Sequence, residues 1–171
     1  MALVGLGGRA RALSFGHASP VDVRRDVLRK LRLPGEVFDD DWSSELRMRL
    51  QSYAAGERVD FSDVAIYGDS ASPFRGAVIS AVRNIGWGRT RTYGDVAAEA
   101  GSAGAARAVG QVMAANPLPL IIPCHRVIGA GGRLGGYSAR TGLTMKRRLL
   151  ALERAVSSEA SELVNGAKAL V

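Results

Sequence analysis

The 171-residue sequence has 47% hydrophobic and 23% charged residues, a composition that is typical of a globular protein and excludes a disordered chain. Its length suits one ordinary domain or two small ones, and no apolar run reaches the roughly 18–20 residues that would cross a bilayer. The net charge of +7 is concentrated in residues 72–154, whose 12 basic and 3 acidic residues favour a polyanionic partner, unless they form a solvated arginine-rich surface.

The sequence contains a single cysteine, Cys124, and two histidines, His17 and His125. One cysteine excludes an internal disulfide and a CxxC redox pair, and one cysteine with two histidines is too few ligands for a closed structural zinc site. The N-terminal stretch MALVGLGGRARALSF lacks the long apolar block of a signal peptide. We therefore expect a cytosolic protein without a metal or other cofactor.

The chain opens with a predicted β-hairpin. Residues 2–6 and 11–17 are β-like runs, and Gly7-Gly8 between them fits a tight turn. A helix is predicted next, because Ser19 is a good N-cap and Pro20 suits the first helical position. This helix is expected to end before Pro34.

A second amphipathic helix is predicted over residues 42–53, with Gly56 ending it. Together these elements indicate a small α/β domain, which with its connection occupies residues 1–68. We find no catalytic constellation in it, and His17 is interpreted as structural.

The following region, 69–156, is predicted to be mainly helical, and the tail from 157 is expected to fray. Ser72 caps its first helix, which carries one apolar face: Phe74, Val78, Val82 and Ile85. Thr92 is the expected N-cap of a helix over 93–100 and Ser102 that of a helix over 103–115. Two helices joined by a tight turn containing glycine fit the helix-turn-helix pattern, although most such pairs are packing units.

The second helix of this pair, in the stretch SAGAARAVGQVMAAN, carries a lone Arg107 among small residues. Small residues allow close approach to a partner surface, or tight packing on a neighbouring helix. Arg107 is less easily explained by packing. After it the sequence predicts a turn-rich loop over 129–142 and a closing basic amphipathic helix, TMKRRLLALER.

The lone thiol lies in the stretch IIPCHRVI. A free cysteine after an apolar run is commonly a buried apolar residue, so Cys124 is either inert or reactive. Adjacent side chains diverge on a strand or helix, so His125 would act on Cys124 through a water molecule. Glu153 is the acidic residue of 72–154 outside the helix pair, and it could orient His125 as in a stretched catalytic triad.

Three stretches resemble the O6-alkylguanine-DNA alkyltransferase family: GRTRTYGDVAAEAG, ARAVGQVMAANPLPLIIPCHRVIG and GGYSARTGLTMKRRLLALER. The resemblance covers residues 73 to about 154. It implies an α/β N-terminal domain that is ribonuclease H-like, followed by a mainly α domain with a winged-helix-like helix-turn-helix. The N-terminal region resembles the family only loosely.

The resemblance also implies catalytic roles. Cys124 would be the alkyl acceptor, activated through water by His125, with Glu153 orienting the histidine. Asn116 would tie the recognition helix to the active-site segment. Tyr93 would brace the 3′ phosphate and present its hydroxyl to guanine N3.

Arg107 would enter the base stack in place of the flipped nucleotide. Further DNA contacts are expected from Tyr93, Ala106, Gly110 and Arg126, and the alkylguanine pocket from Ser138, Tyr137, Val127, Met113 and Pro119. Lys146 matches a family lysine near the pocket, without an assigned role.

The implied function is DNA repair by irreversible, single-turnover transfer of the alkyl group from O6-alkylguanine, and also from O4-alkylthymine, to Cys124. The implied partner is double-stranded DNA entered from the minor-groove side, with no membrane and no obligate protein partner, by a cytoplasmic, nucleoid-associated monomer. The alternatives are a lesion sensor that does not transfer the group, a helix-turn-helix regulator with an inert thiol, and a thiol enzyme acting on a small molecule. The regulator fits less well because Ala, Gly and one Arg are a poor set for reading bases in the major groove.

Overall fold

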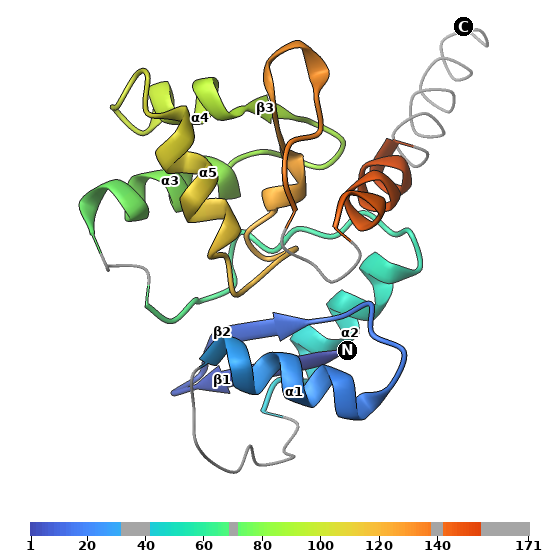
Figure 1. The fold of residues 1–171 in the computed structure, drawn as a ribbon. Helices are drawn as coiled ribbons and strands as arrows, with labels where there is room; N and C mark the ends of the chain where they lie inside the picture. The colour runs from blue at the N-terminus through green and yellow to red at the C-terminus, as the bar shows by residue number, and fades with distance from the viewer. Residues whose placement is uncertain (32–41, 69–71, 138–141, 155–171) are drawn as a thin grey trace, which may run out of the picture.

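The computed structural model describes residues 1–31, 42–68, 72–137 and 142–154. Figure 1 shows two groups of elements, with β1, β2, α1 and α2 on one side and α3, α4, α5 and β3 on the other. These described residues form a mixed α/β fold with two small two-stranded sheets. Predictions for residues 157–171 lie outside the described residues.

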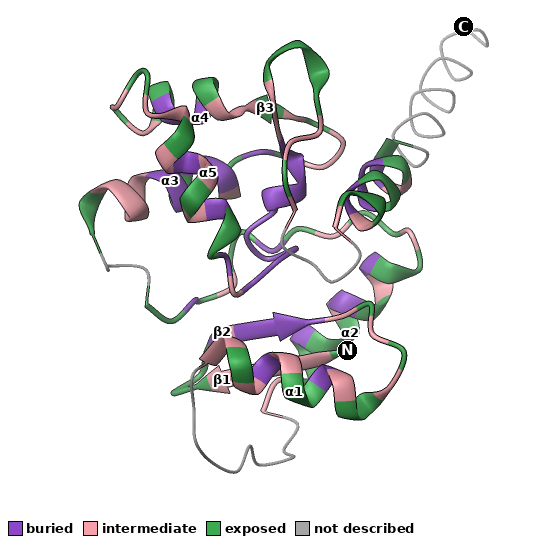
Figure 2. Cartoon of the chain, viewed as in Figure 1, coloured by how far each residue is buried: buried purple, intermediate pink, exposed green. Residues whose placement is uncertain are grey.

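The predicted hairpin is confirmed: β1 (Ala2–Leu6) pairs antiparallel with β2 (Arg9–Ser14) through a turn at Gly7 and Gly8. Both turn glycines have positive φ, which L side chains adopt only with strain. β2 ends at Ser14, three residues earlier than expected. Figure 2 shows that β2 is largely buried, because α1 and the second half of the chain cover it.

Helices α1 (Pro20–Leu31) and α2 (Ser44–Ala54) follow the local signals in the sequence. The α1 helix packs on the hairpin through Val23 and Val27. The side chain of Ser43 caps α2, and Gly56 at φ +96° follows its end. The chain then returns beside β2, where the Ala10 amide donates to the Ala65 carbonyl at 2.8 Å.

Two helices of the second half, α3 and α4, begin at capping residues that the sequence predicts. Ser72 caps α3 (Pro73–Arg83), and a capping box between Thr92 and Asp95 begins α4 (Tyr93–Glu99). The prediction that Ser102 caps the next helix is wrong, because α5 (Ala106–Ala114) begins at the N-cap Ala105. Gly104, in the turn between α4 and α5, has φ +89°, which a right-handed helix does not allow, so α5 can begin only after this residue.

A short parallel sheet holds the segment that contains the thiol. β3 (Arg91–Thr92) pairs with β4 (Val127–Ile128), directly after a 3-10 turn over Cys124–Arg126. A second 3-10 turn, over Ala130–Gly132, follows, and a helix over 143–154 closes the described chain. The sheet therefore fixes the 3-10 turn next to the N-terminus of α4.

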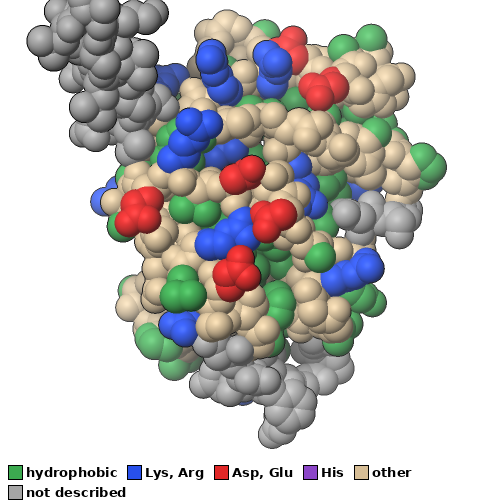
Figure 3. Space-filling model, turned by 180° about the vertical axis from the view of Figure 1, so that it is seen from behind, with side chains coloured by type: hydrophobic (Ala, Val, Ile, Leu, Met, Phe, Trp, Pro, Cys, Tyr) green, Lys and Arg blue, Asp and Glu red, His purple; other side chains and the backbone are tan. Residues whose placement is uncertain are grey.

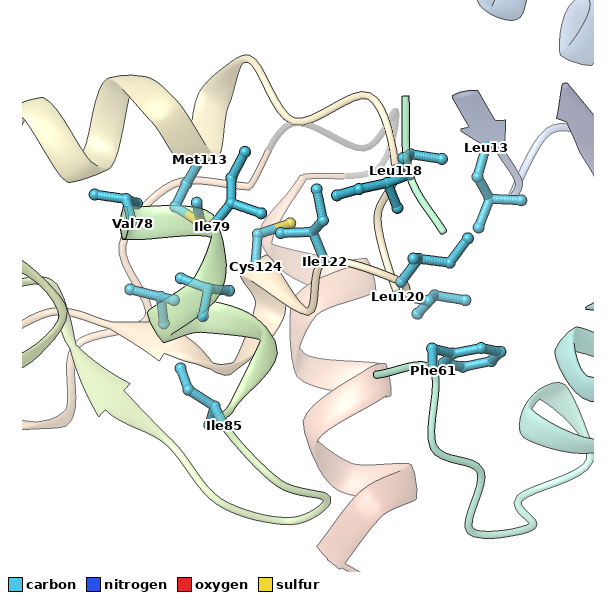
Figure 4. Close-up of a cluster of buried hydrophobic side chains, with 14 of the residues drawn as sticks. Leu13, Phe61, Val78, Ile79, Ile85, Met113, Leu118, Leu120, Ile122 and Cys124 are labelled. Carbon is cyan, nitrogen blue, oxygen red and sulfur yellow. The ribbon is translucent and has the colours of Figure 1, made fainter. Parts of the chain in front are cut away.

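One continuous hydrophobic cluster joins the two halves. It includes Leu13 from β2, Phe61 from the connection, and Leu118 and Leu120 from the segment before the thiol, as Figure 4 shows. The Leu13 amide also donates to the Pro117 carbonyl at 2.9 Å. The first half is thus packed directly against the segment that precedes the thiol.

The face turned away from the viewer in Figure 1 carries Asp and Glu side chains among the Lys and Arg, as Figure 3 shows. That face does not form one continuous basic patch. Among the described residues, no helix is long and apolar enough to cross a membrane.

A cluster around Asp26 ties α1 to β2. Its carboxylate accepts from Ser14 Oγ at 2.6 Å, lies 2.8 Å from Lys30 Nζ and 2.7 Å from Arg29. His17, interpreted as structural, also bonds to Ser14 at 2.9 Å. Burial raises the pKa of Asp26, but these hydrogen bonds outweigh it and hold the pKa well below its usual range.

A carboxyl whose pKa is depressed by folding stabilises the protein above its unfolded pKa, and this stabilisation is lost as pH falls toward the folded pKa. We expect Asp26→Asn to be less stable than wild type at pH 7, and the difference to shrink below about pH 4. Urea unfolding across this pH range measures it. The exposed Glu57→Gln serves as the control, and a difference independent of pH would contradict the prediction.

Candidate active site

Cys124 lies at the start of the 3-10 turn, after an irregular apolar segment that includes Leu120 at φ +76°. Its amide donates to the Ile122 carbonyl at 2.7 Å, and its side chain is 3% exposed within the hydrophobic cluster of Figure 4. Burial raises the pKa of the Cys124 thiol, although Asn116 and Lys146 act in the opposite direction. The resting group is therefore a neutral thiol.

Asn116 anchors the thiol to the end of α5. Its Nδ2 donates to Cys124 Sγ at 3.1 Å and to the Ile122 carbonyl at 2.9 Å. Its Oδ1 accepts from the Leu118 amide at 2.9 Å. Three hydrogen bonds of one buried amide thus link the end of α5 to the segment that contains the thiol.

His125 and Glu153 are both fully buried, and His125 Nε2 lies 2.8 Å from Glu153 Oε1. Burial raises the pKa of Glu153, but hydrogen bonds from His125 and Arg126 outweigh it and lower the pKa to about 2. An ionised carboxylate only accepts, so Nε2 carries a hydrogen. The other ring nitrogen, Nδ1, has no hydrogen-bond partner among the described residues, and its lone pair is available to a proton.

Arg126, which is predicted to contact DNA, is instead buried in the protein. Its side chain is buried: Nε and Nη2 donate to Glu153 at 2.9–3.2 Å, and Nη1 donates to the Ile85 carbonyl at 2.6 Å. Desolvation of an unpaired guanidinium is costly, so the carboxylate holds it in the interior. The sequence could not show this, because an Arg after PCH reads equally well as a phosphate ligand.

Tyr53 joins this group from α2, in a region whose sequence predicts no catalytic constellation. Its hydroxyl donates to Glu153 Oε1 at 2.8 Å. The backbone amide of Gly88 donates to Oε2 at 3.1 Å, and Trp87 Nε1 donates to the Glu153 carbonyl at 3.0 Å. A tyrosine on the apolar face of a predicted helix gives no sequence signal for such a role.

A cavity of about 650 Å³ opens beside the thiol, between the start of α4, one face of α5 and the loop after β4. Of the expected residues it is lined by Cys124, Tyr93, Arg107, Ala106, Gly110, Met113 and Tyr137. Val127 and Pro119 are buried elsewhere and do not line it, and Ser138 lies outside the described residues. Val127 is held in the β3–β4 sheet, and Pro119 belongs to the apolar segment before the thiol.

One wall of the cavity is Tyr93, half-buried at the first position of α4. Burial raises the pKa of Tyr93, so its hydroxyl remains a proton donor. Gly135, at φ +64°, lies so close that an added Cβ would approach the Tyr93 ring to 2.8 Å. This glycine therefore lets the loop close over the tyrosine.

Lys146, to which the sequence assigns no role, is fully buried near Tyr93. Its Nζ donates to the Val127 carbonyl at 2.6 Å and lies 5.9 Å from the centroid of the Tyr93 ring. Burial lowers the pKa of Lys146 to about 8, with the Cys124 thiol acting in the opposite direction. Among the described residues, no three His, Cys, Asp or Glu side chains gather as a metal site would require.

Comparison with known proteins agrees with this geometry. The sequence model of one protein family, the 6-O-methylguanine DNA methyltransferase DNA-binding domain, matches residues 73–155. The methylated-DNA–protein-cysteine methyltransferase of Mycolicibacterium paratuberculosis is 40% identical over 141 residues, which cover 77% of this chain and 82% of that protein. The inducible protein of that name from Bacillus subtilis is 38% identical over 142 residues, which cover 82% and 76%.

Solved structures agree. The O6-methylguanine methyltransferase of Mycobacterium tuberculosis superposes with a TM-score of 0.69 at 36% identity, over 90% of this chain and 85% of that one. The M. tuberculosis protein in complex with DNA gives a TM-score of 0.64 at 34% identity, with the same coverage. A buried Cys–Asn contact, a His–Glu pair and a cavity between two helices thus coincide with similarity along most of the chain. The chain belongs to the methylated-DNA–protein-cysteine methyltransferase family.

Proposed function

We propose that this protein repairs DNA by transferring the alkyl group of O6-alkylguanine irreversibly to its own Cys124. The observation that carries the proposal is that Cys124 lies on the wall of the cavity while Asn116 holds its sulfur at 3.1 Å. A thiol that was only a core residue would need neither the hydrogen bond from the Asn116 side chain nor access to a cavity. Irreversible formation of the S–C bond means that the protein reacts once, and its partner is double-stranded DNA that contains the alkylated base.

In the proposed reaction, the Cys124 proton passes through a water molecule to His125 Nδ1. The thiolate attacks the alkyl carbon, so the S–C bond forms as the bond from carbon to guanine O6 breaks. The electron pair moves into the purine ring, and the Tyr93 hydroxyl stabilises it by donating to N3. Glu153 stabilises the imidazolium without taking its proton, because the pKa of this carboxyl is about 2.

The DNA would meet the protein through α4 and α5, acting as a helix-turn-helix within a winged-helix-like domain over residues 69–156. Ala106 and Gly110 provide a low surface on α5, and the exposed Arg107 lines the same cavity. Arg107 would fill the gap left by the flipped nucleotide, approached from the minor groove. Residues 1–68 would form the small ribonuclease H-like domain, which the antiparallel hairpin under α1 supports.

O4-alkylthymine is proposed as a second substrate, because it presents the same alkyl–oxygen bond to the thiolate. The protein would act as a monomer in the cytoplasm, on the nucleoid. A lesion sensor with an inert thiol would have no use for the Asn116, His125 and Glu153 contacts, so this alternative is disfavoured.

Incubation with a duplex containing O6-methylguanine is expected to add one methyl group to the intact protein, as measured by mass spectrometry. The methyl should map to the peptide that contains Cys124 and be absent from Cys124→Ala, because no other thiol exists in the sequence. Tight binding without modification would instead support the lesion sensor.

Arg107→Ala is expected to slow methyl transfer from a duplex by about tenfold to a hundredfold, since unstacking costs a few kcal/mol and the inserted side chain offsets part of it. Transfer to Cys124 from the free base O6-benzylguanine should stay within about twofold, because a free base needs no flipping. Single-turnover rates on both substrates measure the difference. Arg24→Ala, an exposed site on α1, is the control, and equal losses on both substrates would contradict the role.

A further inference from the structure

The Tyr53 hydroxyl meets two members of the site at once. It donates to Glu153 Oε1 at 2.8 Å and its oxygen lies 3.4 Å from His125 Nε2. Because His125 Nε2 also bonds to Oε1 at 2.8 Å, the tyrosine and the histidine share one carboxylate oxygen. Tyr53 belongs to α2, in the first half of the chain, while its partners belong to the second.

The ring of Tyr53 is held firmly in this position. It packs edge-on against Trp87 with centroids 5.1 Å apart, and lies 6.0 Å from the ring of Phe61. The loop that carries Phe61 is fixed from both sides: Arg49 of α2 bonds to the Asp60 carbonyl and the Asp63 carboxylate, and Arg83 of α3 bonds to three carbonyls of residues 61–64. The hydroxyl therefore has little freedom to leave Glu153.

The shared oxygen is saturated. Tyr53, His125 and Arg126 all donate to Oε1, and Gly88 and Arg126 donate to Oε2. Each additional donor stabilises the carboxylate and reduces how strongly it attracts the Nε2 hydrogen of His125. Gly88 donates to Oε2 and Arg126 donates to both oxygens, whereas the Tyr53 hydroxyl donates to Oε1, where it competes with His125.

We propose that Tyr53 is a positioning residue that limits the basicity of His125 by sharing Glu153 Oε1 with it, so that the imidazole is neutral and ready to accept the Cys124 proton at neutral pH. This proposal rests on the alkyl-transfer function. It makes the first half of the chain a contributor to the reaction beyond its share of the core.

The other charged and titratable groups around His125 set the sign of the expected effect. They are Glu153 and Lys146 from the helix over 143–154, and Arg126 from the 3-10 turn that also contains His125 and Cys124. Burial lowers the pKa of His125, Glu153 raises it, and Arg126 and Lys146 lower it. Burial raises the pKa of the Tyr53 hydroxyl, as does Glu153, so this group stays a donor. Without the Tyr53 hydroxyl, the Glu153 carboxylate would bind the His125 imidazolium more strongly, which would raise the pKa of His125.

The first test is an NMR titration of the His125 ring in full-length Tyr53→Phe, which keeps the aromatic packing. The chain has two histidines, so a His17→Gln variant assigns the signals. The midpoint of His125 should move to higher pH by several tenths of a unit or more in Tyr53→Phe. It should stay in place in Tyr67→Phe, a control at an exposed tyrosine. An unmoved midpoint in a folded Tyr53→Phe protein overturns the proposal.

The second test is the pH dependence of single-turnover methyl transfer. Since a protonated His125 cannot accept the thiol proton, the acid limb of Tyr53→Phe should shift to higher pH while the rate at high pH equals or exceeds that of wild type. A purely structural tyrosine would lower the rate by one factor at every pH, and this result would overturn the proposal. Absence of transfer by wild type would instead refute the proposed function, and the NMR titration would still be readable.

A third variant covers the case in which Tyr53→Phe fails to fold. 3-Fluorotyrosine placed at position 53 keeps the hydroxyl and makes it a stronger donor. The His125 midpoint should then move to lower pH, opposite to the direction expected for Tyr53→Phe. A midpoint that stays in place, or moves upward, contradicts competition at Oε1.

Discussion

The buried carboxylate of Glu153 is the constraint on which the rest of the site depends. An ionised group in the interior is tolerated only when hydrogen bonds replace its lost hydration. Here the donors come from α2, from the turn after α3 and from the 3-10 turn next to the thiol, so three segments distant in sequence must converge on the closing helix. Satisfying the charge therefore also assembles the site.

This arrangement explains why the two halves of the chain are packed as one cluster. The carboxylate and its partners lie at the point where α2, the connection and the second half meet. A loose contact between the halves would admit water and weaken each of these hydrogen bonds. The apolar contacts of Leu13 with the segment before the thiol keep the same junction closed.

Local elements of the fold follow from local signals, whereas the site depends on contacts that local patterns do not encode. The glycine turn of the hairpin and the caps at Ser72 and Thr92 could be read from neighbouring residues, because turn and cap energetics act within a few positions. The start of α5 was misplaced because a turn glycine at positive φ outweighed a good capping residue at Ser102. Arg126 is buried because it pairs with the Glu153 carboxylate, which is 27 positions away in the sequence, and no local pattern encodes this contact. Cys124, His125 and Glu153 could be named from the lone thiol, its neighbouring histidine and the acidic residue outside the helix pair, and the family motif then implied their roles. The motif does not extend to α2 and so missed its tyrosine.

The burial of the thiol has a consequence for chemical selectivity. A protein that reacts once must not react early, and small electrophiles dissolved in the cell would compete for an exposed thiolate. At 3% exposure and with a raised pKa, Cys124 remains a poor nucleophile toward them. A substrate that fills the cavity would hold its electrophilic carbon at the sulfur, so the low intrinsic reactivity of the thiol would favour the bound lesion over dissolved electrophiles.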